Sequence, residues 1–454
     1  MRGLRSTVAL VAVLSGLGAY IYFVTWKIEP DDAAKTVKVF EGLQSDAVIG
    51  LQIKSDKGPM TALEKSERGW QITAPSQEAT DQMEAGSVAT GLASVEKGRI
   101  IEENAPSLDQ YGLASPRIDV AFKTMTDSTF RHLLIGDKTA TGGDLFAKLD
   151  GSNQVFLIPA YQELTFNKGP FDLRDKTMLA FERDKVTSID VVNGGASFTL
   201  AKNSGTTDWD VVEPQRYRAD PSAVEGLRAR LETAQMKTII EPEATEAQIR
   251  EYGLDKPSRS VVLHWDAKTL TLMLGHDAGD GGVYARESAR PNFVVTVDPA
   301  MAEDVTKGAF EYRRKDLFDF RPFNATRITF TRANGSSLPF EKVTTEAKDG
   351  KAAEETWRRL GPNPVDAPKD KIGALLSRLS TMRALSFVET AANTGLDKPE
   401  LTVEARFGDN RTERVMFGRI ENDVYAARPN EPGAARVNDD EYAEAQKTLI
   451  DLAK

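Results

Sequence analysis

The sequence Tyr111-Gly112-Leu113-Ala114-Ser115-Pro116 occurs again, with few changes, at two later places in the chain. The second copy reads Tyr252-Gly253-Leu254-Asp255-Lys256-Pro257, and the third reads Thr394-Gly395-Leu396-Asp397-Lys398-Pro399. A glycine in this setting often ends a helical turn in the left-handed conformation. The proline then favours extended backbone at the residue before it. Each copy therefore predicts the same local structure, a turn that leads into a β-strand.

Two further anchors accompany each turn in a fixed order: a tryptophan before it, and a glycine at the end of a strand after it. Neighbouring copies of one anchor lie 139 to 148 residues apart. Ordered anchors at nearly constant spacing indicate tandem repeats of one structural unit. The predicted structural anchors of the three repeats are Trp70, Trp209, Trp357, Gly112, Gly253, Gly395, Pro116, Pro257, Pro399, Gly136, Gly275 and Gly418.

The hydrophobic pattern changes in the same order within each repeat. In the second repeat, alternating residues on either side of Asn193-Gly194-Gly195 predict a β-hairpin. After the tryptophan strand, Asp220 is a candidate helix N-cap and Pro221 suits the first helical position. The repeat is thus an α+β module, a small antiparallel sheet with a helix covering one face. Apolar residues at helical spacing are Val224, Leu227 and Leu231, and in the third repeat Ile372, Leu375, Leu376, Leu379 and Met382.

The spacings also place the module boundaries. We expect module 1 at residues 40–180, module 2 at 181–319 and module 3 at 320–454. The larger offset of Trp357 predicts an insertion within residues 341–355, a charged segment that we expect to form a solvated hairpin loop.

The joints between modules repeat as well. Leu173-Arg174-Asp175-Lys176 precedes the second module, and Tyr312-Arg313-Arg314-Lys315 precedes the third. These basic residues could form a binding patch. Because they recur at a joint, a structural role is favoured, either capping a helix end or pairing with carboxylates.

The N-terminal sequence predicts a membrane anchor. Residues 6–26 carry no charge, and at ~1.5 Å per residue a helix of this length spans a hydrocarbon layer of ~30 Å. Arginines precede the stretch and acidic residues follow it, which favours residues 1–5 in the cytoplasm. Residues 27–39 would then be a linker to an extracytoplasmic body. A cleaved signal peptide is the alternative, but its apolar region is normally shorter, and no clear cleavage site follows.

Composition excludes several classes of function. Acidic residues (68) outnumber basic ones (58), for a net charge of −10, which argues against a nucleic-acid partner. The chain has no cysteine, so it forms no disulfide, no thiolate metal site and no lipoprotein anchor.

Together the anchors resemble the bacterial domain of unknown function 4340 family. The turns and strand glycines carry the resemblance, with Phe146-Ala147-Lys148 and Tyr284-Ala285-Arg286 in support and Tyr425-Ala426-Ala427 as a weaker copy. The resemblance covers nearly all of the chain after the predicted anchor, and the third repeat departs from it at Thr394. Such proteins often resemble single-span envelope proteins encoded beside ABC transporters of the gliding-motility type. The resemblance implies an accessory or scaffold role and no catalytic residue.

The residues that could carry chemistry favour structural interpretations. The three histidines, His132, His264 and His276, lack the spacing of a metal site. The glycine-rich stretches 136–143 and 275–282 lack the Gly-Lys-Ser/Thr of a phosphate loop and predict hairpin turns. Asp277 and Asp280 lack the closing glutamate of a calcium loop.

Other candidates are weaker still. No Gly-x-Ser-x-Gly motif occurs, and the carboxylate pairs Glu102-Glu103 and Asp439-Asp440 are of a kind common on acidic surfaces. The three tryptophans could stack on carbohydrate. Their shared position at the end of a strand, ahead of a helix, favours core anchors instead.

These observations predict a non-catalytic scaffold or accessory subunit without cofactor or metal. It would be a single-pass bacterial inner-membrane protein with its body in the periplasm, in an envelope assembly of the ABC-transporter type. Its partners would be the membrane, through residues 6–26, and envelope proteins such as permease subunits. An envelope module that binds a ligand or glycan in a groove between repeats is the alternative, and a hydrolase with an unrecognised site is a remote one.

Overall fold

The computed structural model describes residues 37–345 and 354–454. The predicted cytoplasmic segment 1–5, the anchor 6–26 and most of the linker 27–39 lie outside the described residues. Within the described ranges, no helix combines the length and the apolar character needed to cross a bilayer. The chain divides into two compact units, the first ending at Lys176 and the second running from Thr177 to Lys454.

The described residues form three nine-stranded sheets, and every strand pair in them is antiparallel. The first sheet has the order β5-β4-β3-β2-β8-β9-β10-β11-β7. Its strands are β2 (Val48–Ser55), β3 (Gly58–Ser66), β4 (Gly69–Ala74), β5 (Glu78–Ala79), β7 (Ile100–Glu102), β8 (Ile118–Thr124), β9 (Arg131–Lys138), β10 (Asp144–Leu149) and β11 (Val155–Pro159). A separate short pair joins β1 (Val37–Lys38) to β6 (Glu96–Lys97).

The second and third sheets repeat this order, β15-β14-β13-β12-β17-β18-β19-β20-β16 and β24-β23-β22-β21-β26-β27-β28-β29-β25. The second contains β12 (Ser188–Asn193), β13 (Ala196–Lys202), β14 (Trp209–Glu213), β15 (Tyr217–Arg218), β16 (Met236–Glu241), β17 (Arg259–Trp265), β18 (Lys268–Asp277), β19 (Val283–Glu287) and β20 (Arg290–Val297). The third contains β21 (Ala325–Arg332), β22 (Ser337–Thr345), β23 (Glu354–Arg359), β24 (Val365–Asp366), β25 (Ser386–Val388), β26 (Leu401–Phe407), β27 (Arg411–Ile420), β28 (Asp423–Ala427) and β29 (Ala434–Val437).

Each sheet consists of two four-stranded meanders and one added strand. In the second sheet, β12–β15 form the first meander and β17–β20 the second, and they join where β12 pairs with β17. Between the meanders the chain forms a helix and then β16, which pairs with β20 at the far edge. The anchor turn follows and returns the chain to the centre of the sheet. Each sheet lies within one predicted module, and the module boundaries themselves stay predictions.

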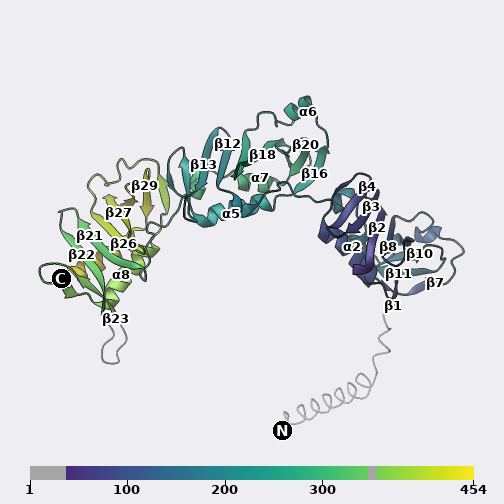
Figure 1. Cartoon of the computed structure of the whole chain (residues 1–454), viewed down its shortest axis with the longest axis horizontal. Helices are drawn as coiled ribbons and strands as arrows, with labels where there is room; N and C mark the ends of the chain where they lie inside the picture. Colours follow the sequence, from purple (N-terminus) through teal and green to yellow (C-terminus); the bar gives the residue numbers. More distant parts are fainter. Residues whose placement is uncertain (1–36, 346–353) are drawn as a thin grey trace, which may run out of the picture. The chain divides into compact units, whose positions relative to one another are not determined.

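One helix in each module packs against a single face of the sheet (Figure 1). These helices are α2 (Gln82–Ser94), α5 (Pro221–Glu232) and α8 (Lys369–Thr381). The predicted N-cap is confirmed, because the Asp220 carboxylate accepts hydrogen bonds from the amides of Ser222 and Ala223. Asp81 caps α2 in the same way, whereas Pro368 holds this position before α8. The predicted apolar stripes of α5 and α8 are buried.

The opposite face of the first two sheets carries a second, smaller apolar cluster. In module 1 its buried members include Tyr111 and Leu113 of the anchor turn and Val155 of β11. In module 2 the corresponding cluster includes Leu254 and Val294. The anchor turn therefore covers part of the face that the main helix leaves open. Neither this cluster nor the ninth strand is among the features predicted from the sequence.

Further helices, of which only α9 is long, complete the modules. They are α3 (Gln162–Phe166), α4 (Pro170–Leu173), α6 (Glu246–Glu251), α7 (Pro299–Val305) and α9 (Asp439–Ala453), with 3-10 turns at η2 (Ser45–Ala47), η3 (Asp109–Tyr111), η4 (Arg183–Lys185) and η5 (Ala309–Tyr312). The expectation of one helix per module was incomplete, because α3, α7 and α9 add a second at the end of each second meander. The coarse prediction of mixed helix and antiparallel sheet is confirmed.

The inserted segment 341–355 differs from the expected loop. β22 and β23 continue into it and pair as far as Thr345 and Glu354. The prediction of a loop over the whole segment was therefore wrong, since both of its ends extend the hairpin strands. The connecting residues 346–353 lie outside the described part of the chain.

Candidate functional site

The anchor turn and the strand glycine, which are far apart in the sequence, contact each other in every module. Gly112, Gly253 and Gly395 have φ angles of 66°, 72° and 73°, the left-handed conformation expected from the sequence. A Cβ atom on Gly275 would lie only 2.1 Å from the carbonyl oxygen of Tyr252. Gly136 meets the carbonyl of Tyr111 at the same distance, and Gly418 would meet that of Thr394 at 2.6 Å. These glycines permit close backbone packing.

The other anchors have structural positions too. Trp70, Trp209 and Trp357 lie on β4, β14 and β23 and are 5–9% exposed, so their rings belong to the cores. Trp70 and Trp209 stand at the beginning of their strands, where the sequence analysis had placed them at the end. Each anchor proline lies two residues before a strand of the second meander, namely Pro116 before β8, Pro257 before β17 and Pro399 before β26.

The joint between modules 2 and 3 lies inside the second compact unit, and its backbone pairs with both modules. On the module 2 side, the amide of Asp220 donates to the Tyr312 carbonyl at 2.7 Å, and Arg314 donates to the Arg218 carbonyl at 3.0 Å. On the module 3 side, the amide of Leu317 donates to the Met382 carbonyl at 3.1 Å. Residues 312–317 therefore act as an extended connector that hydrogen-bonds to both modules.

Asp319, just after this connector, is surrounded by three guanidinium groups. Its carboxylate lies 2.8 Å from Arg218, 3.1 Å from Arg314 and 3.3 Å from Arg428. Burial raises the pKa of Asp319, but the charges of Arg218, Arg428 and Arg314 outweigh burial and lower it overall. The carboxylate is therefore held ionised at the joint.

Glu413 of β27 fixes the start of module 3. Its side chain is 1% exposed, accepts the amides of Asp319 and Phe320 at 2.8 Å each, and binds Arg428 at 2.7 Å. Arg428 also donates to the Leu317 carbonyl at 2.9 Å. A buried carboxylate with this many donors is well compensated.

Arg313 of the connector packs between the two modules. Its guanidinium lies 4.2 Å from the ring centre of Phe387 in module 3 and 5.0 Å from that of Tyr217 in module 2. It also donates to the Pro432 carbonyl at 2.7 Å. Burial lowers the pKa of Arg313, with Glu431 acting in the opposite direction.

The basic residues of the joints were predicted either to cap a helix end or to pair with carboxylates, and Arg174 and Arg314 are found in ion pairs. Arg174 binds Glu78 in the first unit, and Arg314 binds Asp319 in the second.

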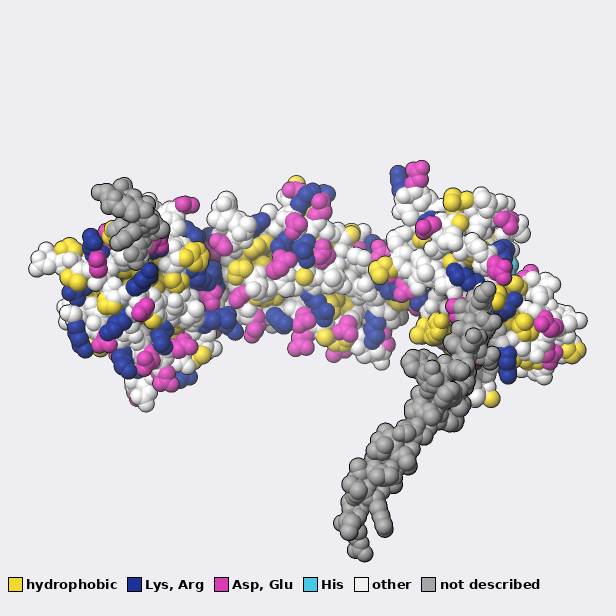
Figure 2. All heavy atoms as spheres, turned by 90° about the horizontal axis from the view of Figure 1, so that it is seen from below, with side chains coloured by type: hydrophobic (Ala, Val, Ile, Leu, Met, Phe, Trp, Pro, Cys, Tyr) yellow, Lys and Arg dark blue, Asp and Glu magenta, His cyan; other side chains and the backbone are white. Residues whose placement is uncertain are grey.

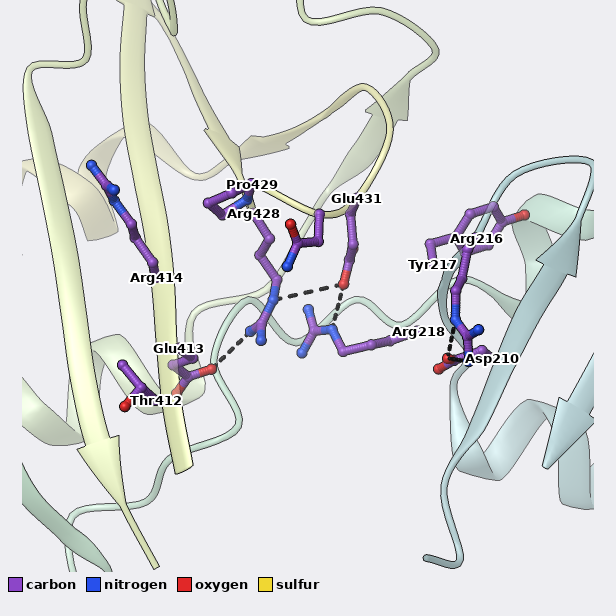
Figure 3. A pocket seen from close by; sticks show the side chains of 11 residues that line it. Asp210, Arg216, Tyr217, Arg218, Thr412, Glu413, Arg414, Arg428, Pro429 and Glu431 are labelled. Atoms are coloured by element: carbon purple, nitrogen blue, oxygen red, sulfur yellow. Dashed lines mark hydrogen bonds and ion pairs between the residues drawn. The ribbon is translucent and has the colours of Figure 1, made fainter. Parts of the chain in front are cut away.

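A cleft of about 340 Å³ opens beside this network, between β14–β15 of module 2 and the hairpins of module 3 (Figure 3). Arg218 donates to Glu431 across it at 2.5 Å, and Arg216 binds Asp210 on the module 2 wall at 2.9 Å. A second cleft of about 370 Å³ shares Asp210 and Arg218 with the first. The lining is rich in guanidinium and carboxylate groups and holds no histidine.

The three histidines lie on strands, and none of them lines either cleft. His132 is 2.8 Å from Asp119 in the first unit, and His264 is 2.7 Å from Asp190 in the second. His276 stands near the end of β18, against Gly253 of the anchor turn. Across residues 37–345 and 354–454, no three histidine, aspartate or glutamate side chains are placed to hold a metal ion.

The glycine-rich stretches end in hairpin turns, as predicted, and their first residues belong to strands. Residues 139–143 connect β9 to β10, and residues 278–282 connect β18 to β19. Asp280 accepts the Gly282 amide at 2.9 Å and the Thr296 hydroxyl at 3.2 Å. The Gly282 amide is the main cause of a lowered pKa for Asp280.

The carboxylate pairs also have local partners. Glu102 accepts the Tyr111 hydroxyl at 2.6 Å, and Gln154 donates to Glu103. Asp439 accepts the Val424 amide at 3.1 Å, at the first turn of α9, where Asp440 also stands. None of these four carboxylates lines either cleft at the joint.

The charged cluster at the joint was not predicted from the sequence. It consists of Arg218, Arg314, Asp319, Glu413 and Arg428. At the repeat offset of 139 residues, Asp319 corresponds to Ala180 and Arg218 corresponds to Ala79. The charged residues are thus departures from the repeat, whereas the predicted anchors are residues that recur in it. A comparison of the repeats that looks for charged residues at positions where the other copy has an uncharged one would identify Asp319 and Arg218.

Comparison with known proteins identifies a family and little else. The profile of the family described as Domain of unknown function (DUF4340) matches residues 70–208 and again 209–399. No curated protein matches the chain. Among solved structures, a DnaN sliding clamp (DNA polymerase III subunit beta) from Pseudomonas aeruginosa bound to griselimycin aligns at 10% identity, over 89% of this chain and 94% of that one. The TM-score of 0.14 is too low to indicate a shared fold.

The two matched segments are consecutive and together cover more than half of the sequence. The two segments begin at Trp70 and Trp209, so their starts are separated by the spacing of the first two tryptophans. The chain is therefore a member of the DUF4340 family that carries the family unit in tandem.

Proposed function

We propose that this protein is a non-catalytic scaffold or accessory subunit of an envelope assembly, anchored in the membrane by residues 6–26 with its body outside the cytoplasm. The observation that carries the proposal is the joint at residues 312–317, which hydrogen-bonds to two modules at once. Such a joint connects modules 2 and 3 into one body, which suits a scaffold subunit that binds other proteins. The recurring residues, being packing and turn residues, also fit a structural role.

The proposed partners are membrane permease subunits of an ABC-transporter type and other envelope proteins. Support comes from the uncharged N-terminal stretch with its flanking charges and from the resemblance of such chains to transporter-associated proteins. The described surface is compatible with protein contacts. On the face seen in Figure 2, side chains of both charges are interspersed, with apolar ones between them.

In-cell crosslinking of the full-length protein, followed by mild detergent extraction and mass spectrometry, tests this proposal. We expect a permease and its ATPase among the crosslinked proteins. As the matched control, a variant with a cleavable secretion signal in place of residues 1–26 should keep the body outside the cytoplasm and lose contacts made through the anchor. Recovery of this protein alone would contradict the scaffold role.

The second candidate function is an envelope module that binds a ligand. The cleft beside the 2–3 joint favours it, because clefts of about 300–1,000 Å³ are typical of small-molecule sites. A rise in melting temperature with added ligand would support this function, and unchanged melting across a broad panel would count against it.

A further inference from the structure

We propose that the groove between α5 and the segment from α7 to η5 in module 2 binds a helix of a partner protein. This helix inserts an aliphatic side chain into the groove and places a lysine or arginine beside Glu311. The inference rests on the scaffold proposal, to which it gives a contact surface and a kind of partner. It does not involve the clefts at the joint.

The groove has a volume of about 420 Å³ and lies along α5. Two small residues of this helix, Ala223 and Gly226, line it, and a Cβ atom on Gly226 would meet nothing within 4 Å. Leu227, which is 4% exposed, lines it as well. The helix therefore leaves room at this place for a side chain of another segment.

A buried hydroxyl also lines the groove. Tyr312 is 3% exposed, and its hydroxyl forms no hydrogen bond with any other residue in the described ranges. Burial raises the pKa of Tyr312, and the charges of Asp304 and Glu311 raise it further, so the hydroxyl stays protonated and can donate. A buried hydroxyl without a protein partner fits a surface that a further molecule covers.

The charges of the groove leave one carboxylate free. Of the four charged residues that line it, three are already paired, because Arg230 and Lys307 both bind Asp304, at 3.2 Å and 2.8 Å. Glu311 is exposed, and no cation among the described residues forms an ion pair with it. The groove therefore offers a carboxylate to an incoming cation.

Module 3 shows what packs at the equivalent place there. The N-caps Asp298 and Asn438 are equivalent, but α7 has 7 residues and α9 has 15. The additional turns of α9 bury Leu449, at 1% exposure, in the core cluster that contains the α8 stripe. Asp451 of the same turns lies 3.7 Å from Lys371 of α8. In module 3 a leucine and a carboxylate–lysine pair thus hold a helix against α8.

Module 2 lacks both of these contacts. The N-caps of α7 and α9 are 140 residues apart, and the second and third tryptophan anchors are 148 apart. At these offsets the equivalent pairs are Leu449 and Ala309, Asp451 and Glu311, and Lys371 and Ala223. The carboxylate is kept, while the leucine and the lysine are each replaced by alanine. A partner helix that supplies an aliphatic side chain and a cation would complete the packing that module 3 makes by itself.

The probe is an alanine-based helical peptide with one leucine and one lysine four residues apart, which places both side chains on one face. Titrated by calorimetry into the full-length protein in mild detergent, it should bind saturably. Gly226→Leu should abolish binding, because the new side chain fills the groove. The melting temperature of this variant should not fall, since leucine suits a helix better than glycine.

Gly373→Leu of α8 is the matched control. A Cβ atom on this helical glycine would also meet nothing within 4 Å, and the site lies in module 3. This variant should bind the peptide like the unmodified protein.

A charge exchange tests the role of Glu311. Glu311→Lys should weaken binding of the lysine peptide about fivefold, because an exposed ion pair is replaced by repulsion. A peptide with glutamate in place of the lysine should regain that affinity with this variant and bind the unmodified protein weakly. Absence of saturable binding, equal weakening by Gly226→Leu and Gly373→Leu, or no recovery after the charge exchange would each overturn the proposal.

Two other occupants would give different results. Sedimentation velocity of the protein alone detects self-association, and a dimer that Gly226→Leu dissociates would assign the groove to a second copy. Isopentylamine has the aliphatic group and the cation without a helix, and binding as tight as that of the peptide would assign a small amine. Either result rejects a partner helix.

The scaffold proposal fails separately. In-cell crosslinking that recovers this protein alone rejects the scaffold, whatever the peptide does. Recovery of a permease that Gly226→Leu leaves unchanged retains the scaffold and overturns the groove as its contact surface.

Discussion

The identity of single residues is most constrained where the backbone of the anchor turn packs directly against the backbone of a strand. Gly275 of β18 lies against the Tyr252 carbonyl, and Gly136 repeats the contact in module 1. The contact connects the anchor turn to the centre of the second meander. It explains why the sequence keeps glycine at both points of each repeat.

We expect Gly275→Ala to lower the free energy of unfolding of the second unit by about 1–3 kcal/mol, because the added methyl group would overlap the carbonyl. Urea denaturation followed by tryptophan fluorescence measures this loss. Gly279→Ala is the matched control, since a Cβ there meets nothing within 4 Å. Equal stability of the two variants would show that the close contact does not constrain the fold.

Asp319 predicts a pH dependence. Its pKa is lowered in the folded state, despite burial, by Arg218, Arg428 and Arg314. The stability it contributes is therefore full above the unfolded value of about 3.9 and is lost as pH falls through the folded pKa. Asp319→Asn should be less stable than the unmodified protein at pH 7, and the difference should shrink toward pH 3. Asp277→Asn, at a carboxylate 90% exposed, should show no such trend.

Among the elements, the connector 312–317 contacts both module 2 and module 3. Arg313 contacts Phe387 and Tyr217, one from each module. Its counterpart Arg174 binds Glu78 instead of an aromatic ring. Equivalent positions of the repeat thus make different contacts.

We expect Arg313→Ala to uncouple the two modules, because the cation–π contacts and the bond to the Pro432 carbonyl disappear. In scanning calorimetry we expect one transition for the second unit of the unmodified protein and two for this variant, while Arg327→Ala, at an exposed arginine of β21, should leave one. A single transition, unchanged in both variants, would refute the coupling role of Arg313.

Whether an element could be predicted depends on how far apart in the sequence its interacting residues lie. The cap at Asp220, the hairpin at Asn193-Gly194-Gly195 and the α8 stripe depend on neighbours in sequence, and all were predicted. β16 pairs with β20 across an intervening meander, which no local pattern records. The sequence pattern gives no sign of Arg218, because its partner Glu431 lies in another module.

At the scale of the molecule, the family unit and the folding unit are offset. The matched segment 70–208 begins with β4 of the first sheet and ends after β13 of the second. It therefore takes strands from two sheets and completes neither. The compact units, in contrast, divide between Lys176 and Thr177.

This offset predicts different outcomes for two truncations. A fragment of residues 177–454 retains two whole sheets and should fold with a cooperative melting transition. A fragment of residues 209–454 loses β12 and β13, and with β12 the partner of β17, so it should not fold cooperatively. Circular dichroism and dispersion of amide proton signals compare them. Folding of both fragments would mean that the first meander is dispensable.

Pro368 has a consequence for how such an array can lengthen. The amides of Asp81 and Asp220 each donate to the segment that leaves their own module, whereas a proline at the corresponding place has no hydrogen to give. A fourth copy appended by gene duplication could not attach to module 3 through the same bond. Any repeat attached to module 3 would have to dock without this backbone hydrogen bond.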